Sequence, residues 1–288
     1  MKPNFQEYLR TLLLLGRVSN LPTVWSNCLA GWMLGGGGVP SDLALLIGAA
    51  TAMYVGGMFL NDAMDVNFDR QHRPERPIPS GRITLGEVWI YGMGLLVVGV
   101  LVFGLFSRTS LILSIYLFTS ILIYDLVHKA LVISPVLMAL CRVFLFLLAA
   151  SVGATGINGL TLWLAMALGL YVVGLSYVAK SESNGGLLRY WPCLALLAPI
   201  GLGLLVNQGD YRPAGNVLAV VVLLWIGRSL YATFWAPQRN IGKTVSQLLA
   251  GIALVDLLAL GGGTFPTPLI FAGLFVLALL FQRFIPAT

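Results

Sequence analysis

Residues 43–84 read LALLIGAATAMYVGGMFLNDAMDVNFDRQHRPERPIPSGRIT. The first part, residues 43–60, carries no charge and combines glycine and alanine with larger apolar side chains. The second part, residues 61–84, contains three aspartates and four arginines. An uncharged run of this length is typical of a helix that crosses a lipid bilayer, and the charges then follow where the helix leaves the membrane. The stretch therefore predicts a membrane-spanning helix that ends in a polar site.

The rest of the chain has the composition of a protein whose solvent is mostly lipid. Of its 288 residues, 58% are hydrophobic and only 10% are charged, which excludes a soluble globular enzyme. Apolar runs of about 20 residues without strict alternation favour helices over a closed barrel. We expect an all-α transmembrane bundle in one domain, residues 1–288, with about nine or ten spans near 18–36, 42–62, 84–106, 109–125, 133–154, 158–179, 189–206, 214–235, 244–263 and 267–284.

Basic residues are distributed unevenly over the expected loops. If the N-terminus is inside, the outer loops keep only Arg108 and Arg212, and most other lysines and arginines lie at inner ends. This bias predicts an integral, multi-pass protein with a cytoplasmic N-terminus and a cytoplasmic polar site, which we expect in a bacterial inner membrane. Membrane lipid is then expected to surround the protein and to be one of its partners. The asymmetry accounts for the net charge of +6 without a nucleic-acid partner.

Asn61, Asp65 and Asp69 follow the apolar run at intervals of four residues. In a continuous helix each interval turns ~40° and rises ~6 Å, so these side chains can line one face while Asp62 points elsewhere. Carboxylates brought this close either raise a pKa or hold a cation between them. Hard oxygen donors suit Mg²⁺, which commonly recruits phosphate oxygens to complete its coordination. The spacing therefore predicts a Mg²⁺ site.

Four arginines come next within one short loop, at Arg70, Arg73, Arg76 and Arg82. Guanidinium groups bind phosphate oxygens in a bidentate way. Arginines also gather in cytoplasmic loops regardless of function, so by themselves they leave a solvated loop open. An arginine loop beside a metal-binding acidic face indicates a diphosphate ligand.

The pattern Asn61-Asp62-x-x-Asp65-x-x-x-Asp69, followed by RPIPSGR at 76–82, resembles the first signature of the UbiA superfamily of intramembrane prenyltransferases. The resemblance extends to chain length and membrane plan. It implies an all-helical bundle of about nine spans, in which the motif binds Mg²⁺ and the diphosphate of an isoprenoid donor. It also implies a metal-binding role for Asn61, Asp65 and Asp69.

Further positions match this family near the inner membrane end. Arg17 and Asn20 match an arginine and an asparagine of the opening helix, although Arg17 equally fits a positive-inside anchor. Tyr124 and Lys129 match a tyrosine and lysine pair. The resemblance implies that Lys129 neutralises diphosphate and that Tyr124 lines the pocket.

Ionisable residues inside apolar segments need partners, because burying them in hydrocarbon is costly. Asp125 can pair with Lys129 or Arg142, or act in catalysis. Arg142 must face the bundle interior, and Asp125, Asp256 or the diphosphate are its candidate partners. The sequence leaves these alternatives open.

The family places a second aspartate motif at the end of the sixth span, here YVVGLSYVAKSESNGG at 171–186. This chain departs from it, because Glu182 is the only carboxylate there and Lys180 precedes it. Either fewer metal ligands are used and Lys180 pairs directly with phosphate, or the transferase chemistry is weakened. Glu-containing variants of this kind resemble the branch encoded in Ebo-type gene clusters.

These features predict Mg²⁺-dependent transfer of a prenyl group from an isoprenoid diphosphate to a lipophilic or aromatic acceptor at the cytoplasmic side, with release of diphosphate. The acceptor proton could go to Asp62, Asp125 or His128. The alternatives are a non-catalytic lipid-binding or transport protein on the same scaffold and a CDP-alcohol phosphotransferase, whose DGxxAR opening is missing. The predicted roles are catalytic for Asp65, Asp69, Lys129 and Asp125, substrate-binding for Asn20, Arg73, Arg76, Arg82, Tyr124 and Lys180, and metal-binding for Asn61, Asp65, Asp69 and Glu182.

Overall fold

The structure, a computed structural model, describes residues 4–129, 131–183, 191–236 and 238–285, with side chains described up to 180 in the second range. Its regular elements are all helical, which confirms the predicted fold class. They are α1 (Phe5–Leu15), η1 (Val18–Asn20), α2 (Leu21–Leu34), α3 (Pro40–Met64), α4 (Val66–His72), α5 (Leu85–Gly104), α6 (Arg108–Val127), α7 (Ser134–Val152), α8 (Gly159–Ser183), α9 (Trp191–Ala195), α10 (Ala198–Val206), η2 (Gly209–Tyr211), α11 (Arg212–Phe234), α12 (Ile241–Ala259) and α13 (Thr267–Phe284).

Eight of the described helices are long and apolar enough to cross a membrane, namely α3, α5, α6, α7, α8, α11, α12 and α13. The expected span at 18–36 corresponds to α2, which has only 14 residues. The described part of the expected span at 189–206 consists of two short helices, α9 and α10, which together form a shorter apolar segment, Trp191–Val206. Pro199 lies in the first turn of α10. A proline there cannot donate to a carbonyl of the preceding turn, so the helix ends and starts again.

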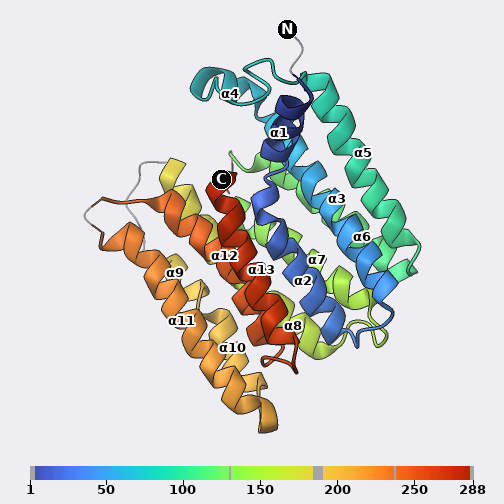
Figure 1. Cartoon of the computed structure of the whole chain (residues 1–288), viewed down its shortest axis with the longest axis vertical. Helices are drawn as coiled ribbons and strands as arrows, with labels where there is room; N and C mark the ends of the chain where they lie inside the picture. The colour runs from blue at the N-terminus through green and yellow to red at the C-terminus, as the bar shows by residue number, and fades with distance from the viewer. Residues whose placement is uncertain (1–3, 130, 184–190, 237, 286–288) are drawn as a thin grey trace.

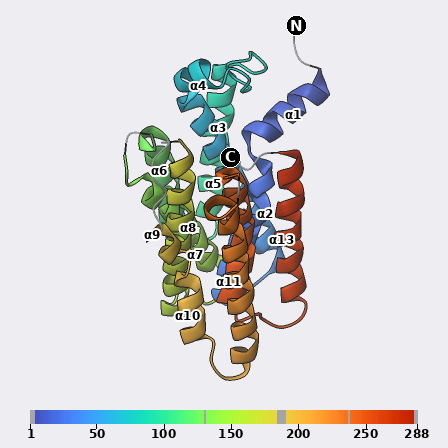
Figure 2. The ribbon, with the colours of Figure 1, turned by 90° about the vertical axis from the view of Figure 1, so that its left-hand side faces the viewer.

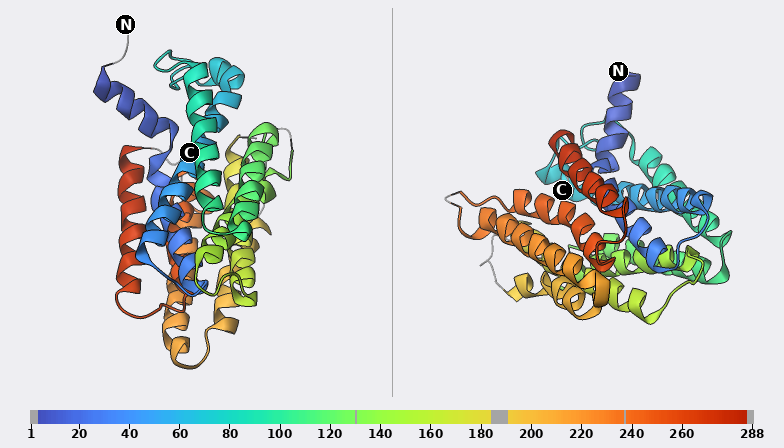
Figure 3. Two further views of the ribbon diagram at one scale, coloured as in Figure 1. Left: turned by 90° about the vertical axis from the view of Figure 1, so that its right-hand side faces the viewer. Right: turned by 60° about the horizontal axis from the view of Figure 1, so that its bottom comes forward.

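The long helices run side by side along one common direction (Figure 1). At one end of the bundle, α1 and α4 extend beyond the long helices (Figure 2). The same end can be followed in Figure 3, where α1 leans outward from the bundle. The residues of the motif loop therefore gather at this end, which lies opposite the loop between α10 and α11.

Two glycines let α3 approach α5 closely, and this contact positions the motif. A Cβ atom added at Gly56 would lie 2.7 Å from the Gly92 carbonyl oxygen, and one added at Gly92 would lie 2.7 Å from Leu60 Cδ2. Neither distance leaves room for a side chain. The helix that carries Asn61 and Asp62 is thus held against α5 within two turns of its end.

Candidate active site

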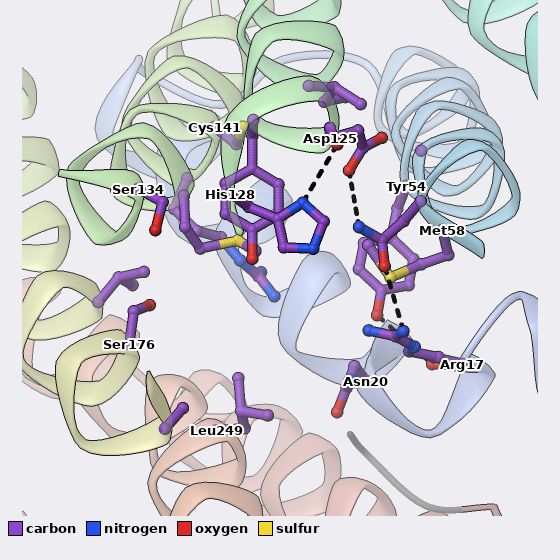
Figure 4. A pocket seen from close by; sticks show the side chains of 18 of the residues that line it. Arg17, Asn20, Tyr54, Met58, Asp125, His128, Ser134, Cys141, Ser176 and Leu249 are labelled. Carbon is purple, nitrogen blue, oxygen red and sulfur yellow. Dashed lines mark hydrogen bonds between the residues drawn. The ribbon is translucent and has the colours of Figure 1, made fainter. Parts of the chain in front are cut away.

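A cavity of about 650 Å³ opens among α2, α3, α6, α7, α8 and α12 (Figure 4). Many of its polar lining residues lie at the ends of α3 and α6 or in the loops that follow α4 and α6, whereas the lining from the middle of α3, α6, α7 and α12 is mostly apolar. The polar lining residues are Arg17, Asn20, Tyr54, Asn61, Asp65, Arg73, Arg76, Tyr124, Asp125, His128, Lys129, Ser134, Ser176 and Lys180, with Arg142 farther along α7. The structure thus places most of the predicted site residues in the lining of this one cavity.

Asp65 lies between α3 and α4 and receives two basic side chains from the end of α6. Its Oδ1 lies 2.7 Å from Lys129 Nζ, and its Oδ2 lies 3.5 Å from His128 Nε2. Burial opposes ionisation of Asp65, but the hydrogen bonds and charges of these partners outweigh it and lower the pKa of its carboxyl group. Burial likewise opposes a charged His128, yet Asp65 raises the pKa of the imidazole. Each partner thus favours the charged form of the other.

Asn61 links the cavity wall on two sides. Its Nδ2 donates to Asp125 Oδ1 at 3.0 Å, and its Oδ1 accepts from Arg17 Nη2 at 3.3 Å. Figure 4 shows Arg17, from the turn between α1 and η1, and Asp125, from α6, on the two sides of these hydrogen bonds, which are drawn as dashed lines. The side-chain amide thereby fixes the orientation of a carboxylate and a guanidinium that both line the cavity.

Arg76 joins the two remaining motif carboxylates. Its Nη1 donates to Asp62 Oδ1 at 3.0 Å and to Asp69 Oδ2 at 3.2 Å. Burial raises the pKa of Asp69 above its ordinary value, and the charge of Arg76 opposes this effect. Neither Asp62 nor Asp69 is among the residues that line the cavity. Both nevertheless lie directly behind Arg76, which does line it.

The predicted common face of Asn61, Asp65 and Asp69 is not formed as one helical stripe. The regular helix stops at Met64 and a new helix begins at Val66, so the 3.6-residue period does not continue through Asp65. Asn61 and Asp65 line the cavity, whereas Asp69 is 2% exposed and faces Arg76. A catalytic contact of Asp69 with substrate would require this ion pair to open.

The donor set nonetheless fits Mg²⁺. Within the described ranges, no three carboxylate, histidine or cysteine groups converge closely enough to hold an ion as they stand. Asp69 Oδ1 and Asp125 Oδ2 are buried, however, and neither has a hydrogen-bond partner among the described atoms. Buried carboxylate oxygens of this kind are costly unless they receive a donor or a cation. Together with Asn61 and Asp65 they offer the hard oxygen ligands that Mg²⁺ prefers.

The other predicted residues fall into three groups. Asn20, Tyr124 and Arg73 line the cavity, and their substrate-binding roles stay predictions. Lys180 also lines it, and its Nζ donates to the Leu131 carbonyl oxygen at 2.6 Å and to Ser134 Oγ at 3.1 Å. Arg82 is exposed next to α5 and is not among the lining residues, so its substrate-binding role stays a prediction. Glu182 belongs to α8, but its side chain lies outside what the structure describes.

Arg17 plays a larger part than the sequence indicated. Its guanidinium reaches Asn61 and Asp62, and its backbone is left-handed, with φ 41° and ψ 48°. It is the one residue other than glycine with positive φ in the described chain. Such backbone strain persists where surrounding contacts require it and is frequent at functional sites. The motif spacing could not reveal this contact, because Arg17 lies in a different segment.

Arg142 is connected to Asp256 through Asn27. Arg142 Nη1 donates to Asn27 Oδ1 at 2.7 Å, and Asn27 Nδ2 donates to both carboxylate oxygens of Asp256, at 2.9 and 2.8 Å. Arg142 also donates to the backbone oxygen and the hydroxyl of Thr23. Of the candidate partners, Arg142 is therefore linked to Asp256, and the link runs through the side-chain amide of Asn27.

Comparison with known proteins places this architecture in a family. A model of the UbiA prenyltransferase family matches residues 23–187, from α2 through α8. A digeranylgeranylglyceryl phosphate synthase of Metallosphaera sedula is 29% identical over 187 residues, which cover 62% of this chain and 56% of that protein. The matched segment thus spans about half the length of this relative.

Two solved structures share the fold. One, described as digeranylgeranylglyceryl phosphate synthase in membranes, superposes with a TM-score of 0.63 at 18% identity, covering 95% of this chain and 99% of the other. The second is a UbiA homologue from Archaeoglobus fulgidus bound to DMAPP and Mg²⁺, with a TM-score of 0.53 at 16% identity and coverage of 96% and 97%.

These relatives are archaeal, so the expectation of a bacterial inner membrane gains no support from them. The narrower likeness to the Ebo-type branch stays a prediction. The family match covers more than half of the chain and contains five of the six helices that surround the cavity. The resemblance first seen in residues 61–82 is thereby confirmed: this integral membrane protein belongs to the UbiA prenyltransferase family.

Proposed function

We propose that this protein transfers a prenyl group from an isoprenoid diphosphate to an acceptor and releases diphosphate. One observation carries the proposal. A single cavity joins a strongly basic polar end to a long apolar interior. An isoprenoid diphosphate has the same two parts, a multiply charged head and an apolar tail.

The basic end suits the diphosphate. Five lysine or arginine side chains line it near the motif, namely Arg17, Arg73, Arg76, Lys129 and Lys180. Arginine binds phosphate oxygens in a bidentate way, and lysine adds a compact charge. Asp65 and Asp125 are the carboxylates in the same lining, so the cations remain in excess.

The apolar end suits the prenyl chain. On α3, the lining residue farthest from Asp65 is Ala50, and 15 positions of helix separate them, about 22 Å at the usual rise. Leu117 of α6 and Leu145 of α7 line the cavity as well. A tail of several isoprene units can therefore extend along α3 among mostly apolar lining residues.

Asn61, Asp65 and Asp69 are the residues we expect to hold Mg²⁺, with Glu182 a further candidate. The Archaeoglobus fulgidus neighbour bound to DMAPP and Mg²⁺ supports this assignment. When bound, the metal would neutralise negative charge on the departing diphosphate.

In the reaction, the C1–O bond of the donor breaks, and the diphosphate leaves with the electron pair while an allylic cation remains. Arg76, Lys129 and Arg17 hold the leaving group through its oxygens. The apolar walls exclude water, which would otherwise capture the cation. A nucleophilic atom of the acceptor then bonds to C1, and its proton passes to Asp125 Oδ2. Asn61 occupies the other oxygen of Asp125, which leaves Oδ2 to receive the proton.

For the acceptor, we favour a lipid of the glyceryl phosphate class over the aromatic ring that the sequence left equally open. The Metallosphaera sedula relative is named as a digeranylgeranylglyceryl phosphate synthase. Such a lipid would enter from the membrane with its phosphate near the basic end. The positive-inside bias of the loops supports a cytoplasmic position for that end.

Release of diphosphate by purified protein in lipid nanodiscs tests the proposal. Donors of one to four isoprene units are assayed with and without Mg²⁺, with a glyceryl phosphate lipid or an aromatic acid as acceptor. We expect Mg²⁺-dependent release that Asp65→Ala abolishes. Tight donor binding without release for any acceptor would instead favour the lipid-binding or transport alternative.

A further inference from the structure

The motif carboxylates are already paired with basic side chains of the protein. Asp65 is held by Lys129 at 2.7 Å and lies near His128, while Asp69 is held by Arg76 at 3.2 Å. Asp62 accepts from both Arg76 and Arg17. Within the described residues, every carboxylate of the first motif therefore has an internal cation as its counter-ion.

This pairing makes it costly for Mg²⁺ to bind alone. To use Asp65 and Asp69, the metal must draw them away from Lys129 and Arg76. Both cations would then face a divalent ion with their own counter-ions removed. Separating a partly buried ion pair leaves a charge uncompensated, and like charges at short range repel.

Diphosphate alone meets the opposite difficulty. It attracts Lys129 and Arg76, both of which line the cavity. Once these side chains turn to the phosphate oxygens, Asp65 and Asp69 remain as unpaired carboxylates beside a multiply charged anion. Binding of both ligands removes each difficulty, because the cations pair with phosphate and the carboxylates pair with metal.

We propose that Lys129 and Arg76 act as internal counter-ions that exchange partners during loading, so that Mg²⁺ and the donor diphosphate bind cooperatively rather than independently. This inference rests on the proposed function, because it concerns the same donor. By reciprocity, diphosphate must raise the affinity for Mg²⁺ by the same factor by which Mg²⁺ raises the affinity for diphosphate.

The contacts of Lys129 suit an exchangeable counter-ion. Its side chain is 39% exposed, and its Nζ lies 3.9 Å from the centre of the Phe68 ring, which is also part of the lining. The aromatic face can retain the ammonium group near the mouth while it changes anionic partners. Arg76 stands between Asp62 and Asp69, so it can release Asp69 and still keep Asp62 as a partner.

Equilibrium binding to the full-length protein in detergent tests the exchange without turnover. Calorimetric titrations measure the affinity for Mg²⁺ alone and the affinity for inorganic diphosphate at saturating Mg²⁺. Saturating Mg²⁺ keeps the formation of the Mg²⁺–diphosphate complex in solution the same for every variant. The variants are Lys129→Met, Arg76→Met and the charge-conserving Lys129→Arg. Lys243→Met is the matched control, because Lys243 is an exposed lysine outside the cavity.

We expect the two ligands to respond in opposite directions. Lys129→Met and Arg76→Met free a carboxylate, so each should bind Mg²⁺ alone about tenfold more tightly than the unmodified protein. The same variants should bind diphosphate at saturating Mg²⁺ about tenfold more weakly, because they lose a phosphate ligand. Lys129→Arg should lie close to the unmodified protein, and Lys243→Met should match it in both titrations.

Two outcomes would overturn the exchange. One is an unchanged affinity for Mg²⁺ alone in both methionine variants, and the other is a joint loss of affinity for both ligands at an unchanged melting temperature. Either result together with normal diphosphate release would overturn this inference and leave the proposed function intact. If the unmodified protein binds neither ligand, the proposed function fails with it.

Discussion

Arg17 Nη2 lies 3.2 Å from Asp62 Oδ1, although the two residues are 45 positions apart in the chain. The same oxygen accepts from Arg76 Nη1 at 3.0 Å. Asp62 thus gathers guanidinium groups from the N-terminal segment and from the motif loop. It is a positioning residue, because both arginines line the cavity and Asp62 does not.

Asp62→Asn should therefore weaken donor binding more than it slows the chemical step. The amide keeps the size of the side chain but loses the charge that holds both arginines, and hydrogen bonds to charged groups contribute about 1.5–3 kcal/mol. We expect KM for the prenyl diphosphate to rise about tenfold, with kcat within about threefold of the unmodified enzyme. Diphosphate-release kinetics measure both constants. Asp210→Asn, at an exposed carboxylate far from the motif, is the control. A fall in kcat at constant KM would contradict the positioning role.

Asp65→Ala should abolish turnover and leave the fold intact. Asp65 is the motif carboxylate that lines the cavity, and removing it takes away a predicted metal ligand and the partner of Lys129. We expect diphosphate release to fall at least about 100-fold, the scale of losing one group that stabilises developing charge. The melting temperature should change by only a few degrees, since Asp65 is partly exposed. Activity above a tenth of the original would refute the assignment.

Asn27→Leu should destabilise the bundle strongly. The leucine cannot bridge Arg142 and Asp256, so both buried charges lose a hydrogen-bond partner. Loss of one partner from a buried ionic network costs about 3–5 kcal/mol, and thermal unfolding in detergent measures it. Combining Asn27→Leu with Arg142→Met and Asp256→Leu removes the charges themselves and should restore most of the lost stability. If this triple variant were less stable than Asn27→Leu alone, the network would not be the cause.

Ala50→Met should shorten the usable length of the cavity. Ala50 is 1% exposed and lines the interior at the far end of the α3 lining. Adding atoms to a packed interior typically costs about 1–3 kcal/mol of free energy. A short donor would not reach the added methionine atoms, whereas a long donor would compete with them for space. We expect kcat/KM for a donor of four isoprene units to fall about tenfold relative to a donor of one unit. The measurement is the ratio of diphosphate-release rates for the two donors. An equal loss for both would show that the substitution acts on the fold instead.

Much of the fold and several site residues were predictable because they depend on local pattern. Apolar runs located every long helix of the described chain, since a bilayer demands an apolar surface and a fully bonded backbone. The motif indicated a polar site that contains Asn61 and Asp65, and its likeness to the family indicated Tyr124 and Lys129. Hydropathy did not indicate that the predicted span at 189–206 is divided into α9 and α10, where a proline lies in the first turn of α10.

The sequence by itself determined the all-α membrane bundle, the family and the place of the acidic motif, because hydropathy and short-range spacing are properties of neighbouring residues. The tertiary structure decided which charges meet. Arg17 reaches Asp62, Lys129 reaches Asp65, and Arg142 reaches Asp256 only through Asn27. Each contact joins residues from separate elements. No periodicity within one helix encodes such a pairing, because it depends on how the helices pack and on the cost of leaving a charge unpaired at their interfaces.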